Sequence, residues 1–133
     1  MSDCIFCEIA TGKRDSHIIQ KEYGFVAFLD IDPYLPGHTI AIPNEHVQDL
    51  FSVYNQDKYL DFCKRIIYHF RNKSSTRLVY TFIMTHKVPH LGMHIIPNVS
   101  DSFRDSMDLL RLRGGYNGTE SLNQVYDYYK MMK

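Results

Sequence analysis

The stretch Val88-Pro89-His90-Leu91-Gly92-Met93-His94-Ile95-Ile96-Pro97 alternates apolar residues with histidines, but one of the alternate positions holds a glycine. Residues two apart on a β-strand face the same side of the sheet, so His90, Gly92 and His94 are expected to share one face. Imidazoles held on a rigid strand are well placed to attack, protonate or orient a phosphate. The alternative is a half-buried strand whose histidines lie at a wet edge.

Three other blocks precede this stretch. They are Cys4-Ile5-Phe6-Cys7-Glu8-Ile9, Phe25-Val26-Ala27-Phe28-Leu29-Asp30-Ile31-Asp32-Pro33 and Pro36-Gly37-His38-Thr39-Ile40-Ala41-Ile42-Pro43-Asn44-Glu45-His46. In this order, the four blocks resemble the motifs of the histidine triad (HIT) family of nucleotide hydrolases and transferases, and they are similar to its zinc-containing, Hint-like branch. Several motifs matched jointly at their spacings are far more specific than one short motif. We therefore expect a HIT-like fold over most of residues 4–97.

The resemblance implies a covalent chemistry that this chain is not equipped to perform. In the family, the middle histidine of the triad attacks the α-phosphate and forms a nucleotidyl-histidine intermediate, which water then resolves. Gly92 stands at that position, and glycine has no side chain to carry the nucleotidyl group. Either the glycine is a substitution made to disable or trap an enzyme, or it is the natural divergence of a relative that lost its nucleophile.

The segment before the triad favours natural divergence. The family usually has a glycine-containing loop with a phosphate-contacting Gln there, whereas here residues 80–84 run almost directly into Thr85-His86-Lys87-Val88. His86 stands where the Gln is usual, and Lys87 where a small hydroxyl residue is usual. A single designed substitution would not also rewrite this loop. His86 and Lys87 are candidates to contact a phosphate, and a solvated turn is the alternative.

The resemblance also implies a nucleotide site. Asp30 matches the acidic residue that accepts hydrogen bonds from ribose hydroxyls, His94 matches the third triad member, which contacts the phosphate, and His38 matches a supporting histidine near the nucleophile. The positions of the apolar base pocket hold Ile5, Phe6, Ile9, Phe28 and Ile31. On burial alone, each of these apolar residues would be an equally reasonable core residue, and His94 a hydrogen-bonded histidine in an inert pocket.

The cysteines indicate a metal site more than a disulfide framework. Three cysteines are few for disulfides, and in a reducing compartment the pair Cys4-x-x-Cys7 indicates metal binding or redox chemistry. Structural zinc takes four ligands in a tetrahedron. The resemblance supplies the other two, because His46 and His90 are the positions at which many relatives complete such a site. Reduced thiols beside ordinary histidines are the alternative.

Composition restricts the class of protein. The 133 residues, 44% of them hydrophobic and 23% charged, suit one globular domain over 1–133 with a real core. Fifteen basic residues balance fifteen acidic ones, which disfavours binding to extended nucleic acid. The chain has neither a signal-peptide pattern nor an apolar run of about 18 residues. We expect no membrane association, and a cytoplasmic or nuclear location.

The residue patterns predict an α+β fold. Strands are expected over 17–20, 25–29, 39–42, 78–84 and 91–96. Helices are expected over 4–10, 56–72, 103–112 and 120–130, the last capped by Thr119. In the 56–72 helix, Tyr59, Leu60, Cys63, Ile66, Ile67 and Phe70 form the apolar stripe. The sheet of about five antiparallel strands would carry its helices on one face, and the resemblance implies a homodimer in which two sheets join side by side.

Two functions from different classes remain open. One is a catalytically impaired pseudoenzyme that binds a purine nucleotide, AMP- or GMP-like, or a protein, and keeps a zinc-containing dimer for assembly or regulation. The alternative is a nucleoside phosphoramidate or dinucleoside polyphosphate hydrolase, present as an active-site variant or relying on another nucleophile such as water. Turnover restored by Gly92→His would support the hydrolase. Its absence would support the binding protein, because the phosphate loop is altered as well.

Overall fold

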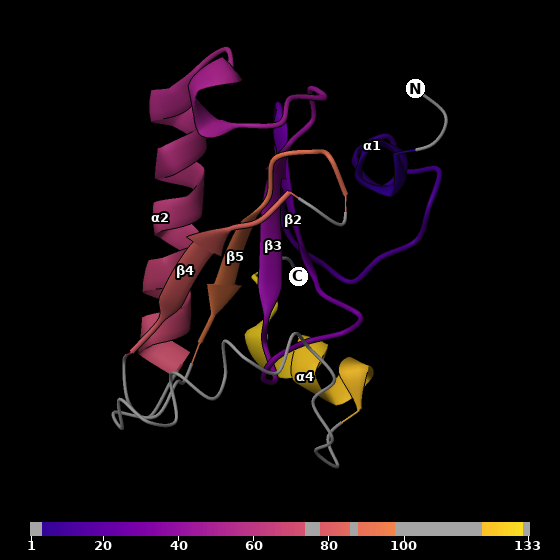
Figure 1. Cartoon of the computed structure of the whole chain (residues 1–133). Coiled ribbons are helices and arrows are strands. Elements are labelled where there is room, and N and C mark those ends of the chain that lie inside the picture. Colours follow the sequence, from indigo (N-terminus) through magenta and orange to yellow (C-terminus); the bar gives the residue numbers. More distant parts are fainter. Residues whose placement is uncertain (1–3, 74–77, 86–87, 98–120, 132–133) are drawn as a thin grey trace.

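The computed structural model describes residues 4–73, 78–85, 88–97 and 121–131. Its centre is a five-stranded sheet in the order β1-β2-β3-β5-β4 (Figure 1), in which every neighbouring pair is antiparallel. The strands are β1 (Ile18–Glu22), β2 (Phe25–Leu29), β3 (Thr39–Pro43), β4 (Tyr80–Ile83) and β5 (Met93–Ile96). The predicted α+β class and the five-stranded antiparallel sheet are confirmed.

One face of the sheet is covered by α2 (Gln56–Lys73). Its buried residues recur at spacings of three and four, as expected for an amphipathic helix, and are Tyr59, Phe62, Cys63, Ile66 and Phe70. They pack in one core cluster with Ala27 and Leu29 of β2. The helix agrees with the prediction, except that Leu60 is 41% exposed and Phe62 lies in the stripe instead.

The opposite face of the sheet is covered by α1 (Ile5–Ala10), which Figure 1 shows across the sheet from α2. Phe6 packs there in a second core cluster with Val26, Phe28 and Ile40. The expectation that all helices lie on one face is therefore wrong for α1. The physical reason is that β2 and β3 are buried at every position, so their second apolar face also needs a covering layer.

The C-terminal helix α4 (Leu122–Tyr129) joins the α2 layer. Its N-cap is Ser121 and not Thr119: the Ser121 hydroxyl accepts the Gln124 N–H, and the Gln124 side chain accepts the Ser121 N–H. Tyr129 packs on Phe70 with ring centroids 5.1 Å apart. The helix expected over 103–112 lies outside the described residues. Among the described helices, none is both long enough and apolar enough to cross a membrane.

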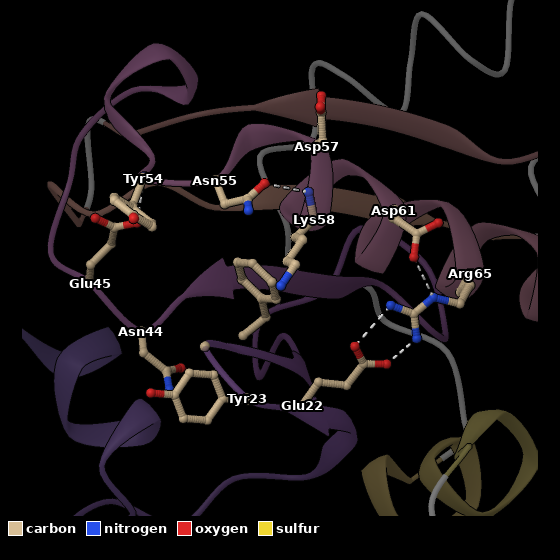
Figure 2. A pocket seen from close by; sticks show the side chains of 12 residues that line it. Glu22, Tyr23, Asn44, Glu45, Tyr54, Asn55, Asp57, Lys58, Asp61 and Arg65 are labelled. Carbon is tan, nitrogen blue, oxygen red and sulfur yellow. Dashed lines mark hydrogen bonds and ion pairs between the residues drawn. The ribbon is translucent and has the colours of Figure 1, made fainter.

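A group of charged residues connects α2 to β1. Arg65 donates hydrogen bonds to Glu22 of β1 and to Asp61, one turn earlier in α2 (Figure 2). The hydrogen bond from Arg65 lowers the pKa of Glu22. These residues line an open hollow of about 680 Å³ beside the β1–β2 turn. None of the residues that line the hollow belongs to either of the two groups of potential metal ligands in the described part of the chain.

Candidate functional site

Four potential metal ligands meet where α1 approaches the segment before β5: Cys4, Cys7, His46 and His90, here called the cysteine–histidine cluster. Cys4 Sγ lies 3.4 Å from His90 Nδ1, and Cys7 Sγ lies 3.3 Å from His46 Nδ1 and 3.5 Å from His90 Nδ1. Tetrahedral zinc, with Zn–S bonds of about 2.3 Å and Zn–N bonds of about 2.1 Å, separates its S and N ligands by about 3.5 Å. The cluster therefore fits a zinc ion.

Hydrogen bonds to the backbone orient this cluster. Cys4 is the N-cap of α1, and its sulfur accepts the Cys7 N–H at 3.3 Å. His90 Nε2 donates to the Pro43 carbonyl at 2.8 Å, so in the neutral ring the lone pair is on Nδ1 and faces the two sulfurs. A hydrogen bond of this kind fixes the tautomer of a metal-binding histidine. His90 is fully buried and His46 is exposed, so the cluster extends from the core to the surface.

The charge states of the cluster also suit a cation. Burial lowers the pKa of His90, so its imidazole is neutral and able to act as a ligand. Burial and the neighbouring Cys4 raise the pKa of Cys7, because a second sulfur nearby makes the thiolate less favourable. A bound cation would reverse this preference and favour the thiolates.

A second group, the histidine–aspartate cluster, consists of Asp30, His38 and His94. His38 Nε2 lies 2.8 Å from His94 Nδ1 and 3.6 Å from Asp30 Oδ2. Two aromatic rings hold the imidazoles in place. Tyr34 stacks on His38 with centroids 5.3 Å apart, and Phe82 of β4 stacks on His94 with centroids 4.9 Å apart.

The hydrogen bonds of His38 determine where its proton lies. The Tyr34 N–H donates to His38 Nδ1 at 3.0 Å, so neutral His38 carries its proton on Nε2 and donates it to His94 Nδ1. Neutral His94 then carries its proton on Nε2. Burial, and secondarily the charge of His94, lower the pKa of His38 to about 3. Because neither nitrogen of His38 offers a lone pair to a metal, this cluster suits hydrogen bonding to an anion better than metal binding.

Gly92 is buried and lies in sequence between the histidines of the two clusters. A Cβ atom built on it would lie 2.8 Å from Ile40 Cγ2, 3.5 Å from Phe6 Cε2 and 3.6 Å from Ile42 Cγ2. Only the contact with Ile40 is closer than normal van der Waals packing. Ile40 and His94 are register partners in the β3–β5 pair. A methyl group of Ile40 thus lies where a side chain at position 92 would begin.

The apolar residues predicted for a base pocket are brought together only in part. Phe6 and Phe28 are buried and meet edge to face, with centroids 5.4 Å apart. Ile9 packs against the same cluster. Ile5 is 39% exposed and Ile31 is 83% exposed, and neither is in that cluster.

Among the polar residues predicted for the nucleotide site, Asp30 lies in a described part of the chain. Asp30 is held in place, because its Oδ1 accepts the Asp32 N–H at 2.9 Å and its own N–H donates to the His38 carbonyl at 2.9 Å. His86 and Lys87, the candidate phosphate contacts, lie outside the described residues.

Three side chains that shape the site were not found from the sequence: Tyr34, Ile40 and Phe82. Phe82 and His94 are register partners in the β4–β5 pair, so their stacking depends on a strand pairing that alternation alone does not specify. Tyr34 is four residues before His38, and its aromatic character near the Pro36-Gly37 turn was the only local signal.

Known proteins resemble this chain over the same region. The HIT domain family model matches residues 11–101. An uncharacterized HIT-like protein of Borreliella burgdorferi is 38% identical over 68 residues, which are 50% of this chain and 49% of that protein, so the match spans about half of that relative's length. Adenosine 5'-monophosphoramidase HINT3 of Danio rerio is 30% identical over 118 residues, which are 81% of this chain and 72% of that protein.

The likeness extends to solved structures. The crystal structure of a Zn-bound histidine triad family protein from Mycobacterium smegmatis has a TM-score of 0.63 and 26% identity, covering 84% of this chain and 93% of that one. The chain therefore belongs to the HIT domain family, a family of nucleotide-binding proteins and hydrolases. Its cysteine–histidine cluster fits the ion that is bound in the mycobacterial structure.

Proposed function

We propose that this protein binds a purine nucleotide, such as AMP or GMP, and lacks the covalent step of its family. The observation that carries this proposal is the packing at Gly92. Position 92 has no side chain to accept a nucleotidyl group, and Ile40 Cγ2 lies 2.8 Å from where a Cβ would stand. Natural divergence is the origin that we propose for the glycine, because the segment before the triad departs from the family pattern as well.

The remaining groups of the site suit a bound nucleotide. His94 Nε2 carries the proton when the ring is neutral, and this N–H suits a phosphate oxygen. The Asp30 carboxylate would accept hydrogen bonds from ribose hydroxyls, and the cluster that contains Phe6 and Phe28 would form the apolar wall beside the base. If they reach the site, His86 and Lys87 would add cationic contacts to the phosphate.

Zinc would have a structural role in this protein. Cys4, Cys7, His46 and His90 would hold it and so connect α1 to the segment before β5. With four protein ligands the ion has no open position for substrate, which is typical of structural zinc. Its contribution would be to the free energy of folding.

We also propose that the chain folds as one domain and forms a homodimer. β4 is at one edge of the sheet, and its Ile83 is 40% exposed. An edge strand with an exposed apolar residue is suited to pairing with a second copy. Sedimentation equilibrium would test this, since a monomer at micromolar concentration contradicts it.

Calorimetric titration with AMP and GMP tests the main proposal. We expect a dissociation constant of about a millimolar or tighter, with no protein-bound nucleotide after acid quenching. Asp30→Asn and His94→Ala should weaken binding, whereas Lys58→Ala, in the hollow of Figure 2, should not. Failure of both nucleotides to bind at millimolar concentration would contradict the proposal.

The second candidate function is hydrolysis of a nucleoside phosphoramidate by water. Two observations favour it: the Danio rerio relative is named an adenosine 5'-monophosphoramidase, and the His38–His94 hydrogen bond is present. His94 Nε2 would donate its proton to the leaving nitrogen while water attacks phosphorus, the P–N bond breaks and ammonia leaves; the proton that the water loses would return to His94 through solvent, so the ring ends neutral. Release of AMP from adenosine 5'-phosphoramidate above the buffer rate, lost in His94→Ala, would establish this activity.

A further inference from the structure

We infer that metal binding at the cysteine–histidine cluster raises the affinity of the neighbouring nucleotide site, because α1 carries residues of both. This inference rests on the proposed nucleotide-binding function and gives that site a regulator, a Zn²⁺-like cation. It concerns the coupling of two sites, so it can fail while nucleotide binding itself is confirmed.

The position of α1 depends on its tertiary contacts. It has six residues, and helices shorter than about twelve residues are marginal in water without tertiary contacts. Its described contacts include the packing of Phe6, Ile9 and Ala10 against β2 and β3, the Glu8–Arg14 ion pair at the surface, and the sulfurs that face His46 and His90. A metal ion would convert these sulfur contacts into bonds and so fix the helix on the sheet.

Residues of the metal cluster and residues of the apolar cluster alternate along this short helix. Cys4 and Cys7, three apart, lie at the cysteine–histidine cluster. Phe6 and Ile9, also three apart, pack in the apolar cluster with Phe28. Residues three apart are neighbours on a helix surface. Any shift of α1 that follows loss of the metal therefore moves the apolar wall by the same rigid displacement.

Phe6 connects the two sites by direct contact. Its ring lies edge to face with the ligand His90, with centroids 5.8 Å apart, and with Phe28, with centroids 5.4 Å apart. Phe6 Cε2 also lies 3.5 Å from the Cβ position built on Gly92. One ring thus touches a metal ligand, the apolar wall and the position of the family nucleophile. Displacement of His90 when metal leaves would be transmitted through this ring to the apolar wall and to position 92.

Coupling between binding sites is reciprocal. If zinc increases the affinity for AMP by some factor, AMP must increase the affinity for zinc by the same factor. Couplings of this kind are typically about 5- to 150-fold. We expect an effect of at least about fivefold here, because nucleotide binding to the zinc-free protein has to bring a displaced α1 back to its position on the sheet.

The experiment measures both sides of this cycle on the full chain. AMP is titrated into zinc-loaded and chelator-stripped protein, and zinc affinity is measured against a chromophoric chelator with and without saturating AMP. Both affinities should change by the same factor. Phe6→Leu keeps all four metal ligands and should reduce the coupling to less than about twofold, as expected when the connecting contact is lost. Phe51→Leu changes a phenylalanine that is 81% exposed and lies outside both clusters, and should leave the coupling intact.

Each other outcome overturns the inference in a distinguishable way. Equal AMP affinity in the two forms would refute the coupling and leave the proposed function standing. No AMP binding in either form would refute both. Circular dichroism of the stripped protein shows whether the chain folds without zinc. If the zinc-free chain is unfolded, zinc is required for folding, and the inference of a regulated site is wrong.

Discussion

His38 Nε2 lies 2.8 Å from His94 Nδ1, and the Tyr34 N–H lies 3.0 Å from the other nitrogen of His38. A directed series of hydrogen bonds therefore runs from the Tyr34 backbone through His38 to His94. The two imidazoles act as one unit, because a second proton on His38 would require the Tyr34 N–H contact to break.

The protonation of His38 should make the protein less stable in acid. Burial lowers the pKa of His38 from 6.5 to about 3, so the unfolded chain binds this proton first as the pH falls. The free energy of unfolding should be at its full value above pH 6.5 and decrease as the pH falls from there towards 3. The contribution of this group is up to about 1.4 kcal/mol per pH unit. Urea unfolding of zinc-saturated protein at several pH values between 7.5 and 5 measures it.

The control for this prediction is a neutral replacement. His38→Gln removes the titrating imidazole, so the slope of unfolding free energy against pH should decrease over the same window. Phe51→Leu changes an exposed side chain that does not titrate, and it should leave the slope near that of the parent. Equal slopes in His38→Gln and the parent protein would contradict the assignment.

Removal of zinc should destabilise the protein. Elemental analysis is expected to find one zinc per chain, held by the cysteine–histidine cluster. A ligand that binds only the folded state at 100 times its dissociation constant stabilises that state by about 2.7 kcal/mol, so chelation should lower the melting temperature by several degrees. His46→Ala should reduce the zinc content, whereas His17→Ala should not. Protein purified with zinc in the buffer and still free of the metal would argue against the site.

The elements of this fold that carry strong local signals were predictable from the sequence. The 56–72 helix prediction agrees with α2, because apolar residues recur at spacings of three and four from Tyr59 to Phe70. The strand 25–29 was also predicted, because apolar residues lie between two turns. The position of α1 was not predictable, since a six-residue helix has too few residues to show which face of a sheet it covers. Its placement follows from Val26, Phe28 and Ile40, which are distant in sequence.

In the candidate site, too, local signals were predictable and contacts between residues distant in sequence were not. The Cys4-x-x-Cys7 pair indicated a metal from local spacing, and the family resemblance supplied His46 and His90. The contact between Ile40 and the Gly92 position was not accessible to sequence reasoning, because it depends on the register of β3 with β5. A register shift of one residue would turn each side chain of a strand to the other face, so this contact required the structure.

Restoring a histidine at position 92 should require a second substitution. Gly92→His alone places its Cβ against Ile40 Cγ2, and overpacking of this kind costs about 1–3 kcal/mol. Ile40→Leu removes the methyl branch from Cβ, so the double variant should recover much of that loss. Urea unfolding of the parent, both single variants and the double variant gives the interaction energy. Additive effects would contradict a direct contact between the two positions.

The same variants address the second candidate function. If the phosphate site is intact, Gly92→His with Ile40→Leu should release AMP from adenosine 5'-phosphoramidate faster than the parent and should form a labelled nucleotidyl-protein on acid quenching. A folded double variant that does neither would indicate that more than the nucleophile has been lost, and would favour the binding protein.

Gly37 should be intolerant of any side chain. Its φ is +93°, and a Cβ there would lie 2.7 Å from both Pro97 Cγ and Tyr129 Cε2. Gly37→Ala therefore combines a left-handed backbone penalty of about 1–2 kcal/mol with an overpacking cost of about 1–3 kcal/mol. Because Gly37 directly precedes His38, the change should also weaken AMP binding. Thermal unfolding and AMP titration measure the two effects.

Gly12 provides the matched control for Gly37. Its φ is +81°, and nothing lies within 4 Å of the Cβ position. Gly12→Ala should therefore show the backbone penalty of about 1–2 kcal/mol alone. The difference between the two variants isolates the packing of α4 against the turn that positions His38. If the free energy of unfolding decreases by the same amount in both variants, Tyr129 and Pro97 do not restrict this turn. In that case α4 has no part in holding the histidine–aspartate cluster.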